Sequence, residues 1–323
     1  MNNNRPGNLF KNREIALALL ISCIVFSLFD IRFLSSRNIY NIFQQFSCHA
    51  LLSLGMFFVI LIGGIDLSVG SIMALSIVIM GKYVIGNGGN PYIGIILCML
   101  SGSFLGFLNG LLLTKLNISH PFVVTLGTQN AYRSACFLLT SSVAIANFPS
   151  EIVFWGGRSI FAYMPISTLV VLITYILFSL FLRFSIWGRQ MYAVGGNEYV
   201  AQMSGVDVKL IKIISFTISG FLSGIAGLIL VGRVNAAYPL AGLFWETEAI
   251  TAVIIGGTSF SGGNGNPLNV LLGALFIAVI RNGLIILNIA SEWQLVIMGI
   301  SIIISVYMEK NNNYSINKSA FKG

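Results

Sequence analysis

Residues 63–71 read Gly-Gly-Ile-Asp-Leu-Ser-Val-Gly-Ser and place one carboxylate, that of Asp66, between two long apolar runs. Unpaired backbone groups are costly in hydrocarbon, so a polar break at membrane depth must be buried in protein or line a wet cavity. Transporters use such breaks as binding elements. The segment therefore indicates a solute pathway. The alternative is a cytoplasmic turn in which Asp66 caps the following helix.

Two arginines, Arg133 and Arg281, also lie inside apolar runs. A charged side chain in the middle of a span costs at least ~2.5 kcal/mol on insertion scales, so each arginine needs a partner or water. The candidate counter-ions are Asp66, Glu246 and Glu248. An arginine near a span end could instead reach the interface by snorkelling.

The composition indicates a membrane protein. Of the 323 residues, 56% are hydrophobic and only 9% are charged, against about 25% charged residues in an ordinary soluble domain. So few charged side chains cannot coat a soluble core of this size. The net charge of +8 comes from basic residues scattered between the apolar runs, which argues against a nucleic-acid partner.

Motifs for catalysis and metal binding are missing from the sequence. The four cysteines lie in apolar runs, and His49 and His120 have no neighbouring metal ligands. Glycine precedes lysine only at Gly81-Lys82, and no His-Glu-x-x-His pattern occurs. We expect no catalytic residue, no metal site and no cofactor bound by this chain, and a capping or packing role for both histidines.

Apolar runs supply the helices that must position the polar side chains. A bilayer core about 30 Å thick requires about 20 apolar residues per helix, which predicts about ten spans here. They are residues 15–34, 45–63, 68–84, 92–114, 121–141, 164–183, 211–232, 246–261, 268–288 and 292–308. The predicted fold is an all-α polytopic membrane protein. Gly102, Gly106 and Gly110, at four-residue spacing, predict close helix packing.

Basic residues predict the orientation. With the N-terminus in the cytoplasm, eleven of the 18 basic residues fall inside and five outside, in agreement with the positive-inside rule. We expect both termini in the cytoplasm, with a cytoplasmic tail at residues 1–14 and a permease domain at residues 15–310. Residues 311–323 form an asparagine-rich tail that we expect to be disordered.

The longest polar stretch on the cytoplasmic side covers residues 184–210. Gly195-Gly196 predicts a turn, Asn197 a helix cap with Glu198 in the first turn, and Ser204-Gly205 the end of that short helix. A short helix presented from a membrane domain suits docking into a groove of another protein. An interfacial helix lying on lipid is the alternative.

Several motifs, in this order, resemble the permease subunits of ribose-type ATP-binding-cassette sugar importers over nearly the whole chain. They are Gln44-Gln45, Gly63 through Ser71, Phe122 through Leu126, Gly188-Arg189-x-x-Tyr192-Ala193-x-Gly195-Gly196-Asn197, Gly256-Gly257-Thr258-Ser259 with Ser261-Gly262-Gly263, and Asn282-Gly283-Leu284. The chain departs from the family pattern at Ser134 and at Glu246 through Ile250, which leaves the particular sugar open.

The resemblance implies a type II importer-like permease in the inner membrane that moves a small pentose or hexose by alternating access. It implies a second permease subunit, identical or not, a periplasmic sugar-binding protein and a cytoplasmic ATPase with two tandem domains that binds ATP and Mg²⁺. The ATPase would dock on the coupling segment. Its expected coupling residues are Gly188, Arg189, Gly195, Gly196, Asn197, Glu198, Ser204 and Gly205.

A neutral sugar must exchange its water hydrogen bonds for weak contacts with side chains along the path. The candidate translocation residues are Asp66, Ser68, Asn109, Asn130, Arg133, Glu246 and Asn282. The alternative for the amides among them is hydrogen bonding between helices that holds the bundle together.

Two further interpretations concern energy supply and internal symmetry. A proton- or sodium-coupled secondary transporter of a small polar solute is the alternative function, although such carriers place several interacting carboxylates inside the bundle. The pattern Gly63-Gly64-x3-Ser68-x-Gly70 recurs as Gly256-Gly257-x3-Ser261-x-Gly263. Internal duplication and chance similarity between glycine-rich turns both explain it.

Overall fold

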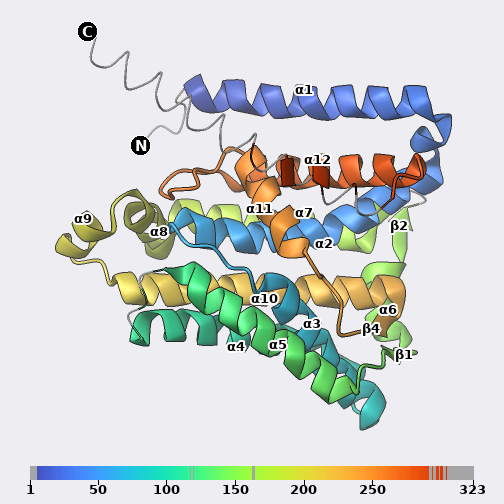
Figure 1. Cartoon of the computed structure of the whole chain (residues 1–323), viewed down its shortest axis with the longest axis horizontal. Helices are drawn as coiled ribbons and strands as arrows, with labels where there is room; N and C mark the ends of the chain where they lie inside the picture. The colour runs from blue at the N-terminus through green and yellow to red at the C-terminus, as the bar shows by residue number, and fades with distance from the viewer. Residues whose placement is uncertain are drawn as a thin grey trace.

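The computed structural model describes residues 6–116, 118, 120–161 and 164–290, and single residues at 293, 296, 297, 299, 300 and 303. The long helices are α1 (Pro6–Phe29), α2 (Ser36–Leu61), α3 (Val69–Gly81), α4 (Pro91–Lys115), α5 (Pro121–Thr140), α7 (Ile166–Phe184), α10 (Val208–Val234) and α12 (Pro267–Ile286). Shorter ones are η1 (Ile31–Leu34), η2 (Lys82–Gly86), α6 (Ser150–Gly157), α8 (Ile186–Gly196), α9 (Glu198–Met203) and α11 (Trp245–Ile255). Two antiparallel ribbons pair β1 (Ile145–Ala146) with β4 (Ala236–Ala237) and β2 (Ser159–Phe161) with β3 (Met164–Pro165). The described part of the chain thus forms a helical bundle (Figure 1) with two very short ribbons.

Six helical segments in the described part of the chain are long and apolar enough to cross a membrane. They are Ser36–Leu61, Val69–Gly86, Pro91–Lys115, Ile166–Phe184, Val208–Val234 and Pro267–Ile286. The apolar part of α1, Glu14–Phe29, is shorter, and the expected last span, residues 292–308, lies mostly outside the described residues. The helical multi-pass fold is confirmed, and the count of about ten spans is not.

The predicted span at residues 246–261 is wrong. α11 covers 11 residues, a length of about 16 Å and so about half of a bilayer core. Gly256 and Gly257 follow it, and Gly257 takes a φ of +81°, which suits glycine because it has no Cβ. α11 is therefore a half-length helix within the bundle.

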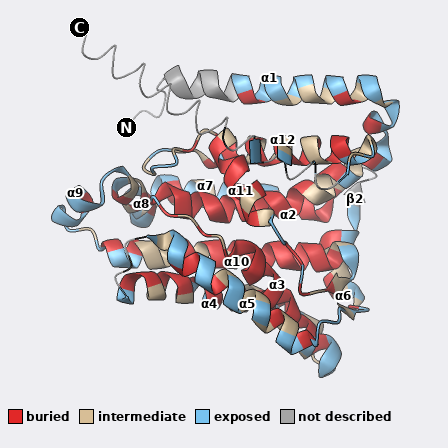
Figure 2. Ribbon diagram, viewed as in Figure 1, coloured by how far each residue is buried: buried red, intermediate tan, exposed pale blue. Residues whose placement is uncertain are grey.

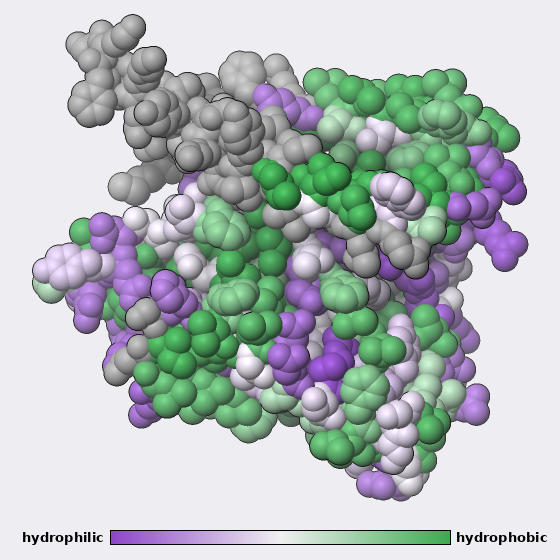
Figure 3. Space-filling view, in the orientation of Figure 1, coloured by the Kyte–Doolittle hydropathy of each residue, from purple (hydrophilic) through white to green (hydrophobic). Residues whose placement is uncertain are grey.

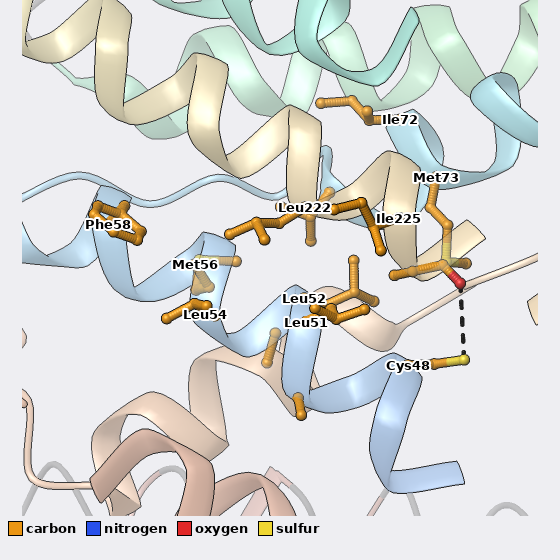
Figure 4. Packing of buried hydrophobic residues seen from close by; sticks show 14 of the residues in the cluster. Cys48, Leu51, Leu52, Leu54, Met56, Phe58, Ile72, Met73, Leu222 and Ile225 are labelled. Atoms are coloured by element: carbon orange, nitrogen blue, oxygen red, sulfur yellow. Dashed lines mark hydrogen bonds between the residues drawn. The ribbon is translucent and has the colours of Figure 1, made fainter. Parts of the chain in front are cut away.

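α2 lies in the interior of the bundle, and most of it is buried (Figure 2). A helix that is apolar on all sides is stable only when other elements cover it on all sides. Figure 4 shows side chains of α2 packed against those of α10 and α3, among them Leu51, Leu52, Leu54, Met56, Leu222, Ile225, Ile72 and Met73. This packing fixes α2 as the element around which the polar residues are arranged.

Glycines bring α4 and α10 into close contact. A Cβ on Gly106 would lie 3.0 Å from Cα of Gly220, and a Cβ on Gly110 would lie 2.7 Å from Cα of Ile213. Gly102 faces the backbone of Gly220 and Gly224 in the same way. The predicted packing role of these α4 glycines is confirmed.

The two ends of the bundle differ. α8 and α9 project from one end, and β1, β4 and α6 lie at the other (Figure 1). Hydrophilic side chains gather at both ends, while hydrophobic ones cover much of the surface between them, including that of α1 (Figure 3). A smaller hydrophilic patch lies over α5 on the same face (Figure 3). The bundle thus has the surface expected of a helix assembly in lipid, with a polar break on one face.

Candidate functional site

Residues 62–68 form the break between α2 and α3. They leave α2 at the end of the bundle where α8 lies and run into the interior without helical structure (Figure 1). Gly63 takes a φ of +77°, and Asp66 is completely buried. Backbone without helical pairing can lie this deep only because protein surrounds it.

Asp66 is held at the start of α3. One carboxylate oxygen, Oδ1, accepts from the backbone N–H of Ser68 at 3.0 Å and from its hydroxyl at 2.6 Å. The other, Oδ2, accepts from the hydroxyl of Ser219 on α10 at 3.2 Å. A carboxylate at a helix N-terminus is also favoured by the helix dipole. Asp66 therefore holds the chain just before α3 inside the bundle, but the N-cap residue is Ser68, so Asp66 does not cap the helix as the alternative expected.

The Asp66 network continues across two more helices. The side-chain amide of Asn109 on α4 donates to the hydroxyl of Ser68 at 2.7 Å. Tyr132 on α5 donates to Oδ1 of Asn109 at 3.1 Å and is also within 3.2 Å of the carbonyl of Leu105. Three of the predicted pathway residues, Asp66, Ser68 and Asn109, are thus brought together in one buried chain of hydrogen bonds.

The starts of α3 and α11 meet inside the bundle. A Cβ on Gly70 would lie 3.1 Å from Oε2 of Glu246, and one on Gly242 would lie 3.3 Å from Cα of Gly70. α3 leads from this point towards η2 and β1, whereas α11 leads towards the end where α8 lies. The N-termini of α3 and α11 therefore face each other. Asp66 lies just before α3, and Glu246 lies in the first turn of α11. Discontinuous helices of transporters also direct helix N-termini at a site inside the bundle.

α5 supplies the polar side chains beside this meeting point. Gln129 donates to Oε1 of Glu246 at 3.0 Å. Arg133 donates through Nη1 to the carbonyls of Pro239 and Ala241, both at 2.6 Å. Oε2 of Glu246 and Nη2 of Arg133 are buried and have no hydrogen-bond partner among the described residues. Arg133 is therefore held by the chain that leads into α11, and Glu246 by Gln129.

Arg281 pairs with Glu248, one of the three counter-ions that the sequence offered. Its Nη1 donates to Oε1 and Oε2 of Glu248 at 2.8 and 3.0 Å. His49 lies between α11 and α12, with Nδ1 3.0 Å from Oε2 of Glu248 and Nε2 3.3 Å from Nη1 of Arg281. The Trp245 ring packs beside the His49 ring, with the ring planes tilted by 49° and the centroids 4.4 Å apart. This cluster joins α2, α11 and α12.

His49 is one of the residues whose contacts the sequence interpretation missed, together with Tyr132, Ser219 and Asn38. It was expected to cap a helix or pack, and it is indeed buried beside Trp245, but it also contacts the Glu248–Arg281 ion pair. The available signal was its position inside an apolar run, where an ionisable group needs a partner. Its partners lie 199 and 232 positions away in the chain, so spacing could not identify them.

The remaining pathway candidates lie elsewhere. Asn282 exchanges two hydrogen bonds with Asn38 across α12 and α2, at 2.8 and 3.0 Å, and both amides are buried. Asn130 lies exposed on α5 and donates at 3.1 Å to the carbonyl of Leu126 one turn earlier. Neither residue contacts the Asp66 network.

The described arrangement favours weak binding of neutral groups. Amides, hydroxyls and partly satisfied charged groups can donate and accept hydrogen bonds without fixing a ligand by charge alone. In the described part of the chain, no group of three or more His, Cys, Asp or Glu could hold a metal ion.

Residues 184–210, the expected coupling segment, contain two short helices, α8 and α9, which are joined at Asn197. Ser185 caps α8 by accepting from the N–H of Gly188 at 2.8 Å, and Asn197 caps α9 by accepting from the N–H of Val200 at 3.0 Å. Glu198 lies in the first turn of α9 and pairs with Lys212 of α10 at 2.8 Å. The predicted cap, first turn and position of this helix are confirmed.

Gly195 and Gly196 lie at the end of α8, and Gly205 lies just after α9. The predicted turn at Gly195-Gly196 is wrong, because both residues belong to the last turn of α8. Ser204 ends α9 and Gly205 follows with a φ of +84°, as predicted for the helix end. The side chain of Arg189 is exposed and reaches the carbonyl of Phe184 at 3.3 Å.

α9 presents an apolar surface. Tyr199, Val200 and Met203 are 68%, 56% and 68% exposed. Ala201, on the opposite side of the helix, is buried. The side of α9 that points away from the bundle therefore carries these three large side chains, with the exposed Gln202 and the Glu198–Lys212 pair beside them.

The chain is similar to known proteins over most of its length. Residues 38–306 match the family model described as the permease component of branched-chain amino acid transport systems. The ribose import permease protein RbsC of Bacillus subtilis is 38% identical over 92% of this chain and 92% of its own length. The D-allose transport system permease protein AlsC of Escherichia coli is 40% identical over 91% of this chain and 89% of its own. The fructose import permease protein FrcC of Rhizobium meliloti is 34% identical over 91% and 84%. No solved structure matches the chain.

Proposed function

The chain belongs to the family of permease components of branched-chain amino acid transport systems, and from this membership we propose that it is the membrane-spanning subunit of an ATP-driven sugar importer. The observation that carries the proposal is likeness over about nine-tenths of the chain to permeases named for ribose, allose and fructose. We assign the substrate class as a small neutral pentose or hexose. ATP and Mg²⁺ bind the partner ATPase.

The translocation path lies beside the meeting point of α3 and α11. Gln129, Arg133 and Glu246 supply partly satisfied polar atoms there, and a sugar hydroxyl can take the place of a missing partner. Asp66, Ser68 and Asn109 are already paired with one another. Their role is to position α3 and α4 on one side of the path.

A second permease subunit covers the exposed side of α5. This helix leaves Asn130 uncovered in a mostly apolar neighbourhood that includes Phe122, Val123 and Leu126. An exposed amide facing lipid is costly, whereas at a subunit contact it can line a shared path. Asn282, in contrast, is a structural link between α2 and α12 because its amide is fully engaged.

The ATPase docks on α9. Its outward face is short, carries the exposed Tyr199, Val200 and Met203, and is flanked by the Glu198 and Lys212 pair, which fits a groove that accepts a helix. α1 begins near the end of the bundle that carries α8 and α9 (Figure 1). This agrees with our assignment of the N-terminus and the coupling segment to the cytoplasmic side of the inner membrane, with the sugar-binding protein on the other side.

Uptake by reconstituted vesicles tests the proposal. Radiolabelled D-ribose, D-allose and D-fructose are offered to vesicles with this chain alone, with the ATPase added, and with the ATPase and the sugar-binding protein. We expect uptake only in the complete system and only with ATP. ATP-independent uptake that a protonophore abolishes would identify a secondary transporter instead.

A further inference from the structure

The end of α8 is wedged into a junction between two glycine-rich turns. The first turn follows α2 at residues 62–68, and the second joins α11 to α12 at residues 256–266. The backbone N–H of Gly263 donates to the carbonyl of Leu61 at 2.9 Å. A Cβ on Gly262 would lie 2.7 Å from the backbone nitrogen of Gly63. The two turns that share a sequence pattern are therefore in direct contact with each other.

Gly195 fills the remaining side of this junction. A Cβ at Gly195 would overlap the carbonyl oxygen of Leu61 and lie 3.0 Å from Cα of Gly263. From the other side, a Cβ on Gly263 would lie 2.6 Å from Cα and from the nitrogen of Gly196. Three backbones thus meet without any side chain between them, and such contacts cannot deform without moving their neighbours.

A hydrogen bond ties α8 to the second turn independently of this packing. The hydroxyl of Tyr192 donates to the carbonyl of Gly265 at 2.9 Å. Burial raises the pKa of Tyr192 to about 12, so the phenol keeps its proton and remains a donor at neutral pH. α8 is therefore attached to the second turn at two points, Gly195 and Tyr192.

Both turns lead directly to the path residues. The first continues to Asp66 and α3. The second follows α11, which carries Glu246 and Glu248. A displacement of α8 would therefore reach both helix N-termini that face each other inside the bundle.

We propose that Gly195 is the positioning residue that transmits movement of the coupling segment to both turns at once, through its contacts with Leu61 and Gly263. The inference rests on the proposed ATP-driven function and adds the place where the coupling segment acts on the membrane domain. In this scheme α9 holds the ATPase, and the end of α8 moves the two glycine-rich turns that lead to the path residues.

The test compares Gly195→Ala with Gly86→Ala in the complete vesicle system. Gly86 is exposed, lies at the other end of the bundle and has only the flexible side chain of Lys82 within 4 Å of its Cβ position. We expect Gly195→Ala to retain the ATPase through purification, since α9 is unchanged. Uptake per ATP hydrolysed should fall about tenfold, within the usual range of coupling between sites. Gly86→Ala should behave as the wild type.

A second variant covers the case in which Gly195→Ala does not fold. Tyr192→Phe removes only the hydroxyl, and we expect it to bind the ATPase normally and to transport severalfold less sugar per ATP. Unchanged coupling in a folded Gly195→Ala protein, or in Tyr192→Phe where Gly195→Ala is unfolded, would overturn the inference. Absence of ATP-dependent uptake in the wild type would instead show that the proposed function is wrong.

Discussion

Arg281 of α12 and Glu248 of α11 form an ion pair in which one guanidinium nitrogen reaches both carboxylate oxygens, at 2.8 and 3.0 Å. The pair lies where the half-length α11 runs beside α12, and His49 of α2 completes it. It fixes the position of α11 from the side opposite to the α3 contact. α11 is thus held between a charged cluster and the path.

Glu248→Gln tests this ion pair. Removal of one partner leaves a mostly buried guanidinium without a counter-ion, and we expect the free energy of unfolding to fall by about 1–3 kcal/mol, because Arg281 is partly exposed and water recovers some of the loss. Thermal unfolding in detergent measures the change. Arg281→Met alone should also destabilise the protein, and the double variant should lose less than the sum of both. Additive losses would contradict the pairing.

Asn38→Ala tests the reciprocal amide contact with Asn282. The change leaves a buried amide without partners, which costs about 1–3 kcal/mol. Asn130→Ala is the matched control for stability, since its amide is exposed and we expect a change within about 0.5 kcal/mol. Equal thermal stability of the two variants would refute a structural role for Asn38 and Asn282.

Ser68→Ala tests the Asp66 network. The hydroxyl of Ser68 donates to Asp66 and accepts from Asn109, so its loss leaves two buried groups short of a partner. We expect destabilisation by about 1–3 kcal/mol, together with reduced uptake, because α3 and α4 are no longer held in register. Ser71→Ala removes only a bond in the first turn of α3, from its hydroxyl to the carbonyl of the N-cap residue Ser68, and should have a small effect. A larger effect at Ser71 would disprove the network.

Met203→Asp tests docking of the ATPase on α9. A charge in an apolar contact must be desolvated on binding, and we expect the affinity for the ATPase to fall about tenfold, which corresponds to about 1.4 kcal/mol. Co-purification and a binding titration measure it. Met203→Leu preserves the apolar surface and should bind as the wild type does. Normal binding by the aspartate variant would remove Met203 from the docking surface.

The sequence by itself determined the features that depend on composition and on neighbours in the chain. Apolar runs identify the multi-pass helical class, because hydrocarbon excludes unpaired backbone. The cap at Asn197 follows from a local hydrogen bond to Val200. The spacing of Gly102, Gly106 and Gly110 predicts close packing because four residues return to the same face of a helix. Family membership likewise follows from the order of motifs along the chain.

Only the tertiary structure decided which distant residues meet. Sequence offered three counter-ions for two arginines, and packing selected Glu248 for Arg281 while it directed Arg133 to backbone carbonyls. It also shortened α11 and wedged Gly195 against Leu61. Side-chain periodicity reports which face of a helix is apolar but not which partner covers it, because that depends on the simultaneous packing of all the helices.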